Sequence, residues 1–134
     1  RLLALMRRAD SVTAFSHALN DQSLAVVADR LGEQEFEAVL TRGAVDSLTA
    51  YDTLRERLRR VVTAPAADIR VTDDDIPVAV TVVEDVVTLL VRDDRGVVQA
   101  AVATSDRASR EWTERRYEQY RSKSTPLTAD DIDA

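Results

Sequence analysis

The order and spacing of the apolar segments constrain the fold of this chain more than any other feature of its sequence. Three short strand-like runs, at 11–18, 36–41 and 68–71, alternate with segments whose apolar residues recur at helical spacing. This alternation is typical of β–α–β units. Strands that are joined through a helix lie parallel, with right-handed crossovers. The first half of the chain is therefore predicted to form a parallel sheet.

In the second half, strand-like runs follow one another with almost no sequence between them. They cover 78–83, 86–92 and 97–103. Glu84-Asp85 joins the first pair, and the turn at 93–96 joins the second. Connections this short cannot form parallel crossovers, so we expect antiparallel hairpins.

Four helical segments accompany these strands, at 1–9, 21–31, 44–62 and 104–124. The predicted fold is α/β, bordering on α+β: a mixed sheet of about six strands, parallel in the first half and antiparallel in the second, with helices packed on it. The 134 residues suit one domain, which can bury a core without disulfide or metal staples. The acidic tail at 126–134 is expected to fray.

The composition argues against several classes of function. The chain carries 24 acidic and 18 basic side chains, a formal charge of -6, so this segment gains little from phosphate neutralisation and is not expected to touch DNA. It has no cysteine and one histidine, which argues against disulfides and against thiolate or histidine-rich metal sites. No apolar run reaches the about 18 residues of a membrane span. We expect a cytoplasmic protein without cofactor, metal or membrane contact.

The kind of charge is also informative. The acids are 16 Asp and 8 Glu, and the bases are 17 Arg and the single Lys123. Short, strongly hydrated carboxylates with almost no lysine suit a surface that stays soluble at high salt, as in halophilic proteins. A GC-rich codon bias produces the same composition, so both interpretations stay open.

The first candidate binding residues follow the predicted strands. Ser16 and His17 end the first strand, and Thr41 and Arg42 follow the second. Ligands of open α/β sheets gather at the carboxyl ends of parallel strands, so these four side chains are expected to line one crevice. A lone histidine is more often structural, and that interpretation of His17 stays open.

The last predicted helix supplies the remaining candidates for ligand binding. Thr104 and Ser105 lie at its start, and Trp112 lies on one of its faces. Trp112 either packs on the sheet with its polar end in water or forms the aromatic wall of a ligand pocket.

The motifs of common catalytic machineries are absent from the sequence. There is no G-x-S-x-G, and His17 is followed by Ala18 and Leu19 instead of the H-x-K-x4-D of phospholipase D-type nucleophiles. The three glycines form no phosphate-cradling loop. The acidic runs at 73–75 and 93–94 lack the spacing of a calcium loop. The sequence thus predicts a protein that is not an enzyme.

Several short motifs occur in an order that resembles a known family of archaeal transcriptional regulators. The motifs are Arg7-Arg8-Ala9-Asp10-Ser11-Val12 with Phe15-Ser16, Glu37-Ala38-Val39-Leu40-Thr41 with Val45 and Leu48, Asp75-Ile76-Pro77-Val78-Ala79-Val80, Asp93-Asp94-Arg95-Gly96, Thr104-Ser105-Asp106, and Glu111-Trp112 with Tyr117-Glu118-Gln119-Tyr120-Arg121. Over residues 1–127, the chain is similar to the domain family named after a methanogenesis regulatory protein and abundant in haloarchaea. It departs from that family at Val78, where an aromatic is usual, and at His17, where a proline is common.

The resemblance implies an outline similar to the phospholipase D-like half-fold without its catalytic motif, preceded by a DNA-binding winged helix-turn-helix. On this basis residues 1–10 are a connector helix, 11–125 a sensor and dimerisation domain, and 126–134 an acidic tail. The expected function is the effector-binding domain of a haloarchaeal transcriptional regulator. It is expected to act as a homodimer, to bind an unknown small-molecule effector, and to reach DNA only through the winged domain. Two alternatives stay open: a structural dimerisation module without ligand, and a degenerate phosphodiesterase.

Overall fold

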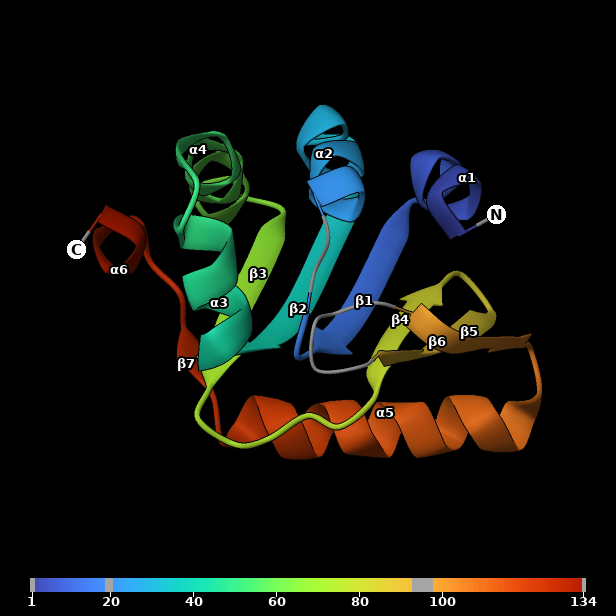
Figure 1. Ribbon diagram of the computed structural model, residues 1–134. Coiled ribbons are helices and arrows are strands. Elements are labelled where there is room, and N and C mark those ends of the chain that lie inside the picture. The colour runs from blue at the N-terminus through green and yellow to red at the C-terminus, as the bar shows by residue number, and fades with distance from the viewer. Residues whose placement is uncertain (1, 19–20, 93–97, 134) are drawn as a thin grey trace.

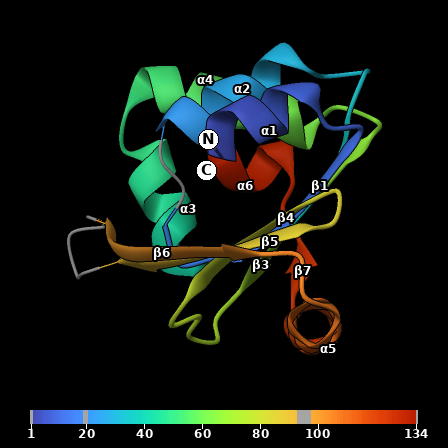
Figure 2. The ribbon, with the colours of Figure 1, turned by 90° about the vertical axis from the view of Figure 1, so that its right-hand side faces the viewer.

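The computed structural model describes residues 2–18, 21–92 and 98–133. Its elements in chain order are α1 Leu2–Arg8, β1 Ser11–Ser16, α2 Asp21–Asp29, β2 Glu35–Thr41, α3 Arg42–Thr49, α4 Asp52–Val62, β3 Ala67–Thr72, β4 Ala79–Val83, β5 Val86–Arg92, β6 Val98–Thr104, α5 Arg107–Ser122, β7 Thr125–Pro126 and α6 Ala129–Asp133. The strands form one seven-stranded sheet in the order β6-β5-β4-β1-β2-β3-β7. Helices α1, α2, α3, α4 and α6 lie on one face of the sheet, and α5 lies across the other (Figure 1 and Figure 2).

The sheet has the mixed topology that the sequence predicts. Strands β1, β2 and β3 are parallel, as two β–α–β units require. Strands β4, β5 and β6 add to β1 in turn, each antiparallel to its neighbour. The predicted α/β class is therefore confirmed, and the additional seventh strand is the two-residue β7, which pairs with β3. The predicted turn at 93–96 lies outside the described residues.

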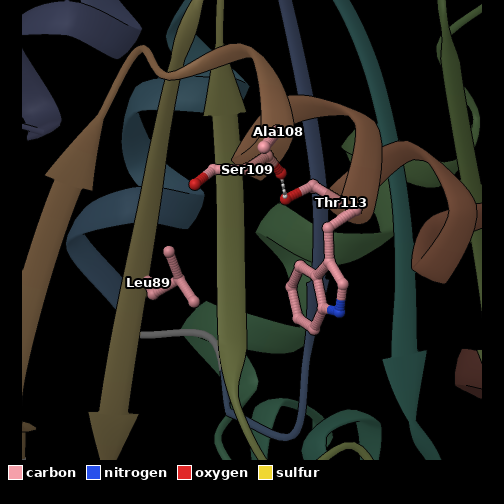
Figure 3. Close-up of a pocket in the computed structure, with 5 residues that line it drawn as sticks. Leu89, Ala108, Ser109 and Thr113 are labelled. Atoms are coloured by element: carbon pink, nitrogen blue, oxygen red, sulfur yellow. Dashed lines mark hydrogen bonds between the residues drawn. The ribbon is translucent and has the colours of Figure 1, made fainter.

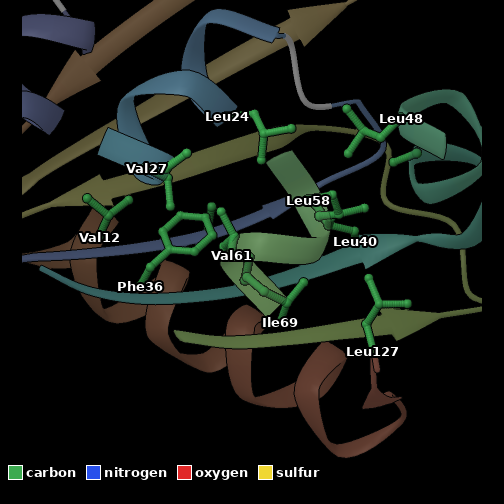
Figure 4. Packing of buried hydrophobic residues seen from close by; sticks show 14 of the residues in the cluster. Val12, Leu24, Val27, Phe36, Leu40, Leu48, Leu58, Val61, Ile69 and Leu127 are labelled. Atoms are coloured by element: carbon green, nitrogen blue, oxygen red, sulfur yellow. The ribbon is translucent and has the colours of Figure 1, made fainter. Parts of the chain in front are cut away.

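The main hydrophobic core lies between the sheet and the face that carries five of the described helices. The side chains of β2 alternate, so that Phe36, Ala38 and Leu40 all point into this core. Figure 4 shows Phe36 of β2 near Val27 of α2 and Val61 of α4. Burying one large apolar side chain contributes about 1.5–3 kcal/mol, so this set of contacts dominates the stability of the fold.

A smaller core lies on the opposite face, where α5 covers the sheet. Five buried side chains of the sheet and its loops pack there with Tyr117 of α5: Phe15, Val39, Ile76, Val80 and Val87. The ring of Tyr120 also joins this layer, with its centroid 5.1 Å from that of Phe15. In the part of the chain that the structure describes, α5 is the one helix that packs on this face, so part of the face remains accessible.

The prediction of one continuous helix over 44–62 is wrong. The structure divides this segment into α3 and α4 at Tyr51, whose backbone is extended with φ -119° and ψ 133°. Asp52 then lies in the first turn of α4, where its charge complements the helix dipole. The break allows Leu48 of α3 and Leu58 of α4 to be buried in the same core.

The expectation that the acidic tail frays is also wrong. Leu127 and Ile132 are 5% and 2% exposed and belong to the main core. The Leu127 amide donates a hydrogen bond to the Ile69 carbonyl at 2.9 Å. Thr128 and Asp131 cap α6 reciprocally, the Thr128 amide donating to the Asp131 carboxylate at 3.0 Å. Two buried apolar side chains and a cap outweigh the tendency of a charged terminus to fray.

Candidate functional site

The sheet residues beneath α5 form a row that changes from apolar to acidic. Val87, Val82, Thr13, Glu37 and Asp68 are register partners on β5, β4, β1, β2 and β3. Helix α5 crosses this row on the face opposite the other described helices (Figure 1). The space between the helix and the row is not completely filled, and it contains two adjoining cavities.

The first space, which we call the Trp112 cavity, has a volume of about 350 Å³. It is lined by Leu89, Ala108, Ser109, Trp112 and Thr113. Figure 3 shows Leu89 on β5 and the other labelled residues on α5. The Thr113 hydroxyl donates to the Ser109 carbonyl at 2.8 Å, so this polar group is satisfied inside the helix. The walls are otherwise mainly apolar.

The second space, which we call the Glu37 cavity, has a volume of about 410 Å³. Its lining residues are Thr13, Glu37, Val82, Thr113, Glu114, Tyr117 and Glu118. Thr113 lines both cavities, so they adjoin under α5. Both volumes fall in the range of about 300–1,000 Å³ that is usual for small-molecule sites.

Tyr117 is the most perturbed polar group of the Glu37 cavity. Its side chain is 7% exposed, and its hydroxyl is buried without a hydrogen-bond partner among the described residues. Burial, followed by the negative charges of Glu37 and Asp68, raises the pKa of Tyr117 to about 12. The nearby Arg121 guanidinium opposes part of this rise, and it forms an ion pair with Asp68 at 3.1 Å. Tyr117 therefore stays a neutral hydroxyl throughout the physiological range.

Four of the predicted binding residues lie at the carboxyl ends of β1 and β2 or directly after them. Ser16, His17, Thr41 and Arg42 meet there because the two strands are parallel and in register. Ser16 is 4% exposed, and its hydroxyl accepts a hydrogen bond from the Ala18 amide at 3.0 Å. The His17 Nδ1 is buried without a partner among the residues that the structure describes.

The other two polar groups at this edge are engaged in local structure. The Thr41 hydroxyl accepts from the Ala44 amide at 3.1 Å and so caps α3. The Arg42 guanidinium donates to the Asp73 carboxylate at 2.7 Å. These contacts stabilise the loops that follow the strands and leave ligand binding by these residues as a prediction.

The three remaining candidates lie elsewhere. Thr104 ends β6, and Ser105 follows it, three strands away from β1. Strand β6 runs antiparallel to β1. The carboxyl end of β6 therefore lies at the opposite ends of the strands from the carboxyl ends of β1 and β2. The Thr104 hydroxyl accepts from the Asp106 amide at 3.0 Å. Trp112 lines the Trp112 cavity, so a pocket is present next to the side chain that was predicted to form either an aromatic wall or a packing contact.

Sequence reasoning missed most of the residues that line the Glu37 cavity. One signal was available, because Glu37 is a charged residue between Phe36 and Ala38 in a predicted strand. Glu114 and Glu118 give no local signal of a site, because they alternate with arginines at helical spacings that favour ion pairs on the helix surface. Their position next to Glu37 depends on where α5 crosses the sheet, which no local pattern specifies.

Within 2–18, 21–92 and 98–133, no helix is long and apolar enough to cross a membrane. In the same ranges, no three histidine, aspartate or glutamate side chains are placed to hold a metal ion.

Two solved structures superpose on this fold. The archaeal chromatin protein TrmBL2, whose structure shows a novel mode of DNA binding, superposes with a TM-score of 0.64 at 14% identity, over 94% of this chain and 48% of that one. Nuc, a phospholipase D family member from Salmonella typhimurium, superposes with a TM-score of 0.65 at 11% identity, over 95% of this chain and 88% of that one. This chain thus spans about half the length of the chromatin protein. At such identities the likeness shows a phospholipase D-like fold.

The sequence identifies the class of protein more closely than the fold does. No curated protein sequence matches the chain significantly. The family described as methanogenesis regulatory protein FilR1, middle domain, matches residues 1–123, and the chain belongs to this family. It is therefore a domain of the kind found in the middle of a regulatory protein.

Proposed function

We propose that this chain is the effector-sensing and dimerisation domain of an archaeal transcriptional regulator. In this proposal, a winged helix-turn-helix domain elsewhere in the regulator binds DNA, and residues 1–10 connect the two. Membership in the FilR1 middle-domain family supports the regulatory part. The aspartate-rich, lysine-poor composition agrees with a haloarchaeal source.

The observation that carries the sensing part is the pair of adjoining cavities under α5. A ligand that entered both would contact α5 on one side and the four strands β5, β4, β1 and β2 on the other. Such a ligand shifts a conformational equilibrium only if it binds one arrangement of α5 more tightly than another. A single helix on an otherwise accessible face can adopt such alternative arrangements more easily than the five helices of the main core.

The strands that line the Glu37 cavity also hold the proposed connector. The side chain of Gln34, which immediately precedes β2, donates to the carbonyls of Met6 at 2.6 Å and Ala9 at 2.9 Å. The Asp10 amide, at the start of β1, donates to the Glu84 carboxylate at 2.9 Å. Movement of β1 or β2 would therefore be transmitted directly to α1.

The outer strand β6 supports the dimerisation part. Its sequence, VQAAVAT, contains no charge and no proline, which are the features that normally protect an edge strand from pairing. The four residues from Ala100 to Ala103 are all exposed. Val102 and Val91 are 59% and 45% exposed and lie on neighbouring strands. An identical strand related by a two-fold axis could pair with this edge and cover both valines.

The sensing proposal is tested by retention of a small molecule. The purified chain is incubated with archaeal cell extract, and retained compounds are detected by native mass spectrometry and by their effect on the melting temperature. Two variants each fill one cavity, Ala108→Phe at the Trp112 cavity and Val82→Phe at the Glu37 cavity. Ala50→Phe, at an exposed position outside both cavities, is the matched control.

We expect the wild type and Ala50→Phe to retain the same compound and at least one filling variant to lose it. Retention of no compound, or equal retention by all four proteins, would overturn the sensing proposal. It would favour an assembly module without ligand, a candidate that the local engagement of Ser16, Thr41 and Arg42 also supports. The phospholipase D-like fold leaves phosphodiesterase activity as another outcome, which turnover lost on His17→Ala would reveal.

A further inference from the structure

The short turn between β4 and β5 contacts elements from both faces of the sheet. It consists of Glu84 and Asp85, which lie between the end of β4 and the start of β5. The Glu84 carboxylate accepts a hydrogen bond from the Asp10 amide at 2.9 Å. The Asp85 carboxylate lies 3.5 Å from a guanidinium nitrogen of Arg110 on α5. Two adjacent residues thus join the end of the connector to the helix that lies on the opposite face from α1 (Figure 1).

The backbone of Glu84 has a conformation that is unfavourable for a residue with a side chain. Among the described residues, Glu84 is the one non-glycine residue with a positive φ, which is 54°. Glycine is the residue that suits a positive φ at the first position of a two-residue hairpin loop, because it has no Cβ. Such strain persists only where the surrounding contacts fix it. The hydrogen bond from Asp10 is the contact that explains a glutamate at this position.

The end of the connector is also held from a second side. The side chains of Arg30 and Gln34 donate hydrogen bonds to three carbonyls in the segment 6–9. The Asp10 carbonyl accepts from the Glu35 amide at 2.9 Å. These contacts come from the segment that leads from α2 into β2, whereas Glu84 approaches from the β4–β5 turn. Of the contacts that hold the connector, the one from Glu84 is adjacent to a contact with α5.

The link between Arg110 and Asp85 depends on where α5 lies. The Asp85 carboxylate is the ion-pair partner of Arg110 in the described ranges, and the Arg110 Nε is buried without a hydrogen-bond partner there. The two side chains are 39% and 83% exposed, so the pair adds little to stability. Its effect is positional, because any displacement of α5 along the sheet changes the separation of these two groups.

We propose that the Glu84-Asp85 turn couples the position of α5 to the connector, with Asp85 following Arg110 and Glu84 positioning the Asp10 amide. Each residue of the turn has only two soft backbone dihedrals, so the two side chains cannot move independently. A contiguous set of contacts of this kind can carry coupling between two faces of a domain. This inference states how the domain is regulated and rests on the proposed sensing function.

The hydrogen-exchange rate of the Asp10 amide, measured by NMR on the whole chain, tests the coupling. We expect Arg110→Gln to raise this rate about two- to fivefold, the range that corresponds to the energy of an exposed ion pair. Arg115→Gln is the matched control, since it removes the same charge from an exposed position of α5 that forms no ion pair with a described residue. It should leave the rate within about 1.5-fold of wild type.

Glu84→Gly separates the positioning role of Glu84 from a merely structural role in the turn. Glycine adopts a positive φ without strain, so the melting temperature should be kept or raised. The Asp10 amide should nevertheless exchange at least about fivefold faster, because its acceptor is gone. In this background, Arg110→Gln should have no further effect on the Asp10 amide.

Several results would overturn the coupling. They are an unchanged Asp10 rate in Arg110→Gln, an equal change in Arg115→Gln, an unchanged rate in Glu84→Gly, and a response to Arg110→Gln that persists in the Glu84→Gly background. A chain that retains a compound from extract but shows no response at Asp10 keeps the sensing function and loses only this coupling. A response at Asp10 in a chain that retains no compound keeps the coupling and removes the sensing.

Discussion

Tyr117 shows how much one side chain in this domain depends on its surroundings. Its ring fills the smaller core, while its hydroxyl lies near Glu37, Asp68 and Arg121. The hydroxyl has lost its contact with water and has gained no partner among the described residues. Folding therefore leaves the cost of its desolvation uncompensated.

We expect Tyr117→Phe to raise the free energy of unfolding at neutral pH by up to about 1 kcal/mol, because it removes a buried donor that has no acceptor. Tyr120→Phe, on the same helix and only half-buried, is the matched control and should have a smaller effect. Urea denaturation of the three proteins measures both changes. A loss of stability in Tyr117→Phe would mean that the hydroxyl is satisfied in solution.

The pH dependence of stability gives a second measurement at the same residue. Burial raises the pKa of Tyr117 from 10.0 to about 12, so the folded state holds this proton more tightly than the unfolded state. The contribution of this group to the free energy of unfolding is complete below the unfolded-state pKa of 10.0, and it is lost as the pH rises through the folded-state pKa of about 12. In that window the wild type should lose up to about 1.4 kcal/mol per pH unit relative to Tyr117→Phe. Parallel pH profiles of the two proteins would contradict the raised pKa.

At the scale of elements, the outermost strand β6 is the feature that most affects how the domain meets other molecules. It pairs with β5 on one side, and its other side is the edge of the described sheet. Edge strands of monomeric proteins usually carry a lysine, a proline or a bulge that prevents further pairing. The pairing of β6 with β5 shifts register between Val91 and Arg92, but it is regular from Ala100 to Thr104. This regular stretch has no charge and no proline, which favours a strand that is covered in the assembled protein.

Substitution of Val102 by lysine should convert the proposed dimer into a monomer, because the charge would be buried without a partner at the strand-to-strand interface. Tyr51→Lys is the matched control, since Tyr51 is 68% exposed and lies between α3 and α4, far along the chain from the edge. Light scattering coupled to size-exclusion chromatography gives both masses. A dimer that survives Val102→Lys would place the interface elsewhere, and a monomeric wild type would remove dimerisation from the proposed function.

At the scale of the whole molecule, the first and last helices, α1 and α6, lie on the same face of the sheet, at opposite sides of the layer of helices (Figure 1). Met6 of α1 and Ile132 of α6 are each 2% exposed and both belong to the main core. The ion pair between Arg59 of α4 and Asp133, at 3.2 Å, adds a surface contact of small value. The C-terminal segment is therefore part of the folded unit.

We expect Ile132→Asp to lower the free energy of unfolding by about 2–4 kcal/mol, because it replaces a buried apolar side chain by a charge. Asp130→Ala, at an exposed position of the same short helix, should change it by less than about 0.5 kcal/mol. Chemical denaturation with circular dichroism compares the two variants. A small effect at Ile132 would show that α6 is detached in solution, as a frayed tail would be.

The course of the chain was largely predictable, and the candidate site was not. The parallel order of β1 and β2 follows from the helix between them, which brings Ser16 and Thr41 to the same edge as expected. The break at Tyr51 was missed because apolar spacing continues across it. The cap formed by Thr128 and Asp131 did leave a local signal, a threonine followed three residues later by an acid.

The sequence by itself determined the class of fold and the family, because periodicity and connection length are local properties that survive without knowledge of packing. Only the tertiary structure decided which polar groups meet. Glu37 and Glu118 are 81 positions apart, and they share a cavity because α5 crosses the sheet over β2. The unpartnered hydroxyl of Tyr117 likewise depends on that crossing. The position of α5 is set by the sum of many apolar contacts, which no single segment of the sequence encodes.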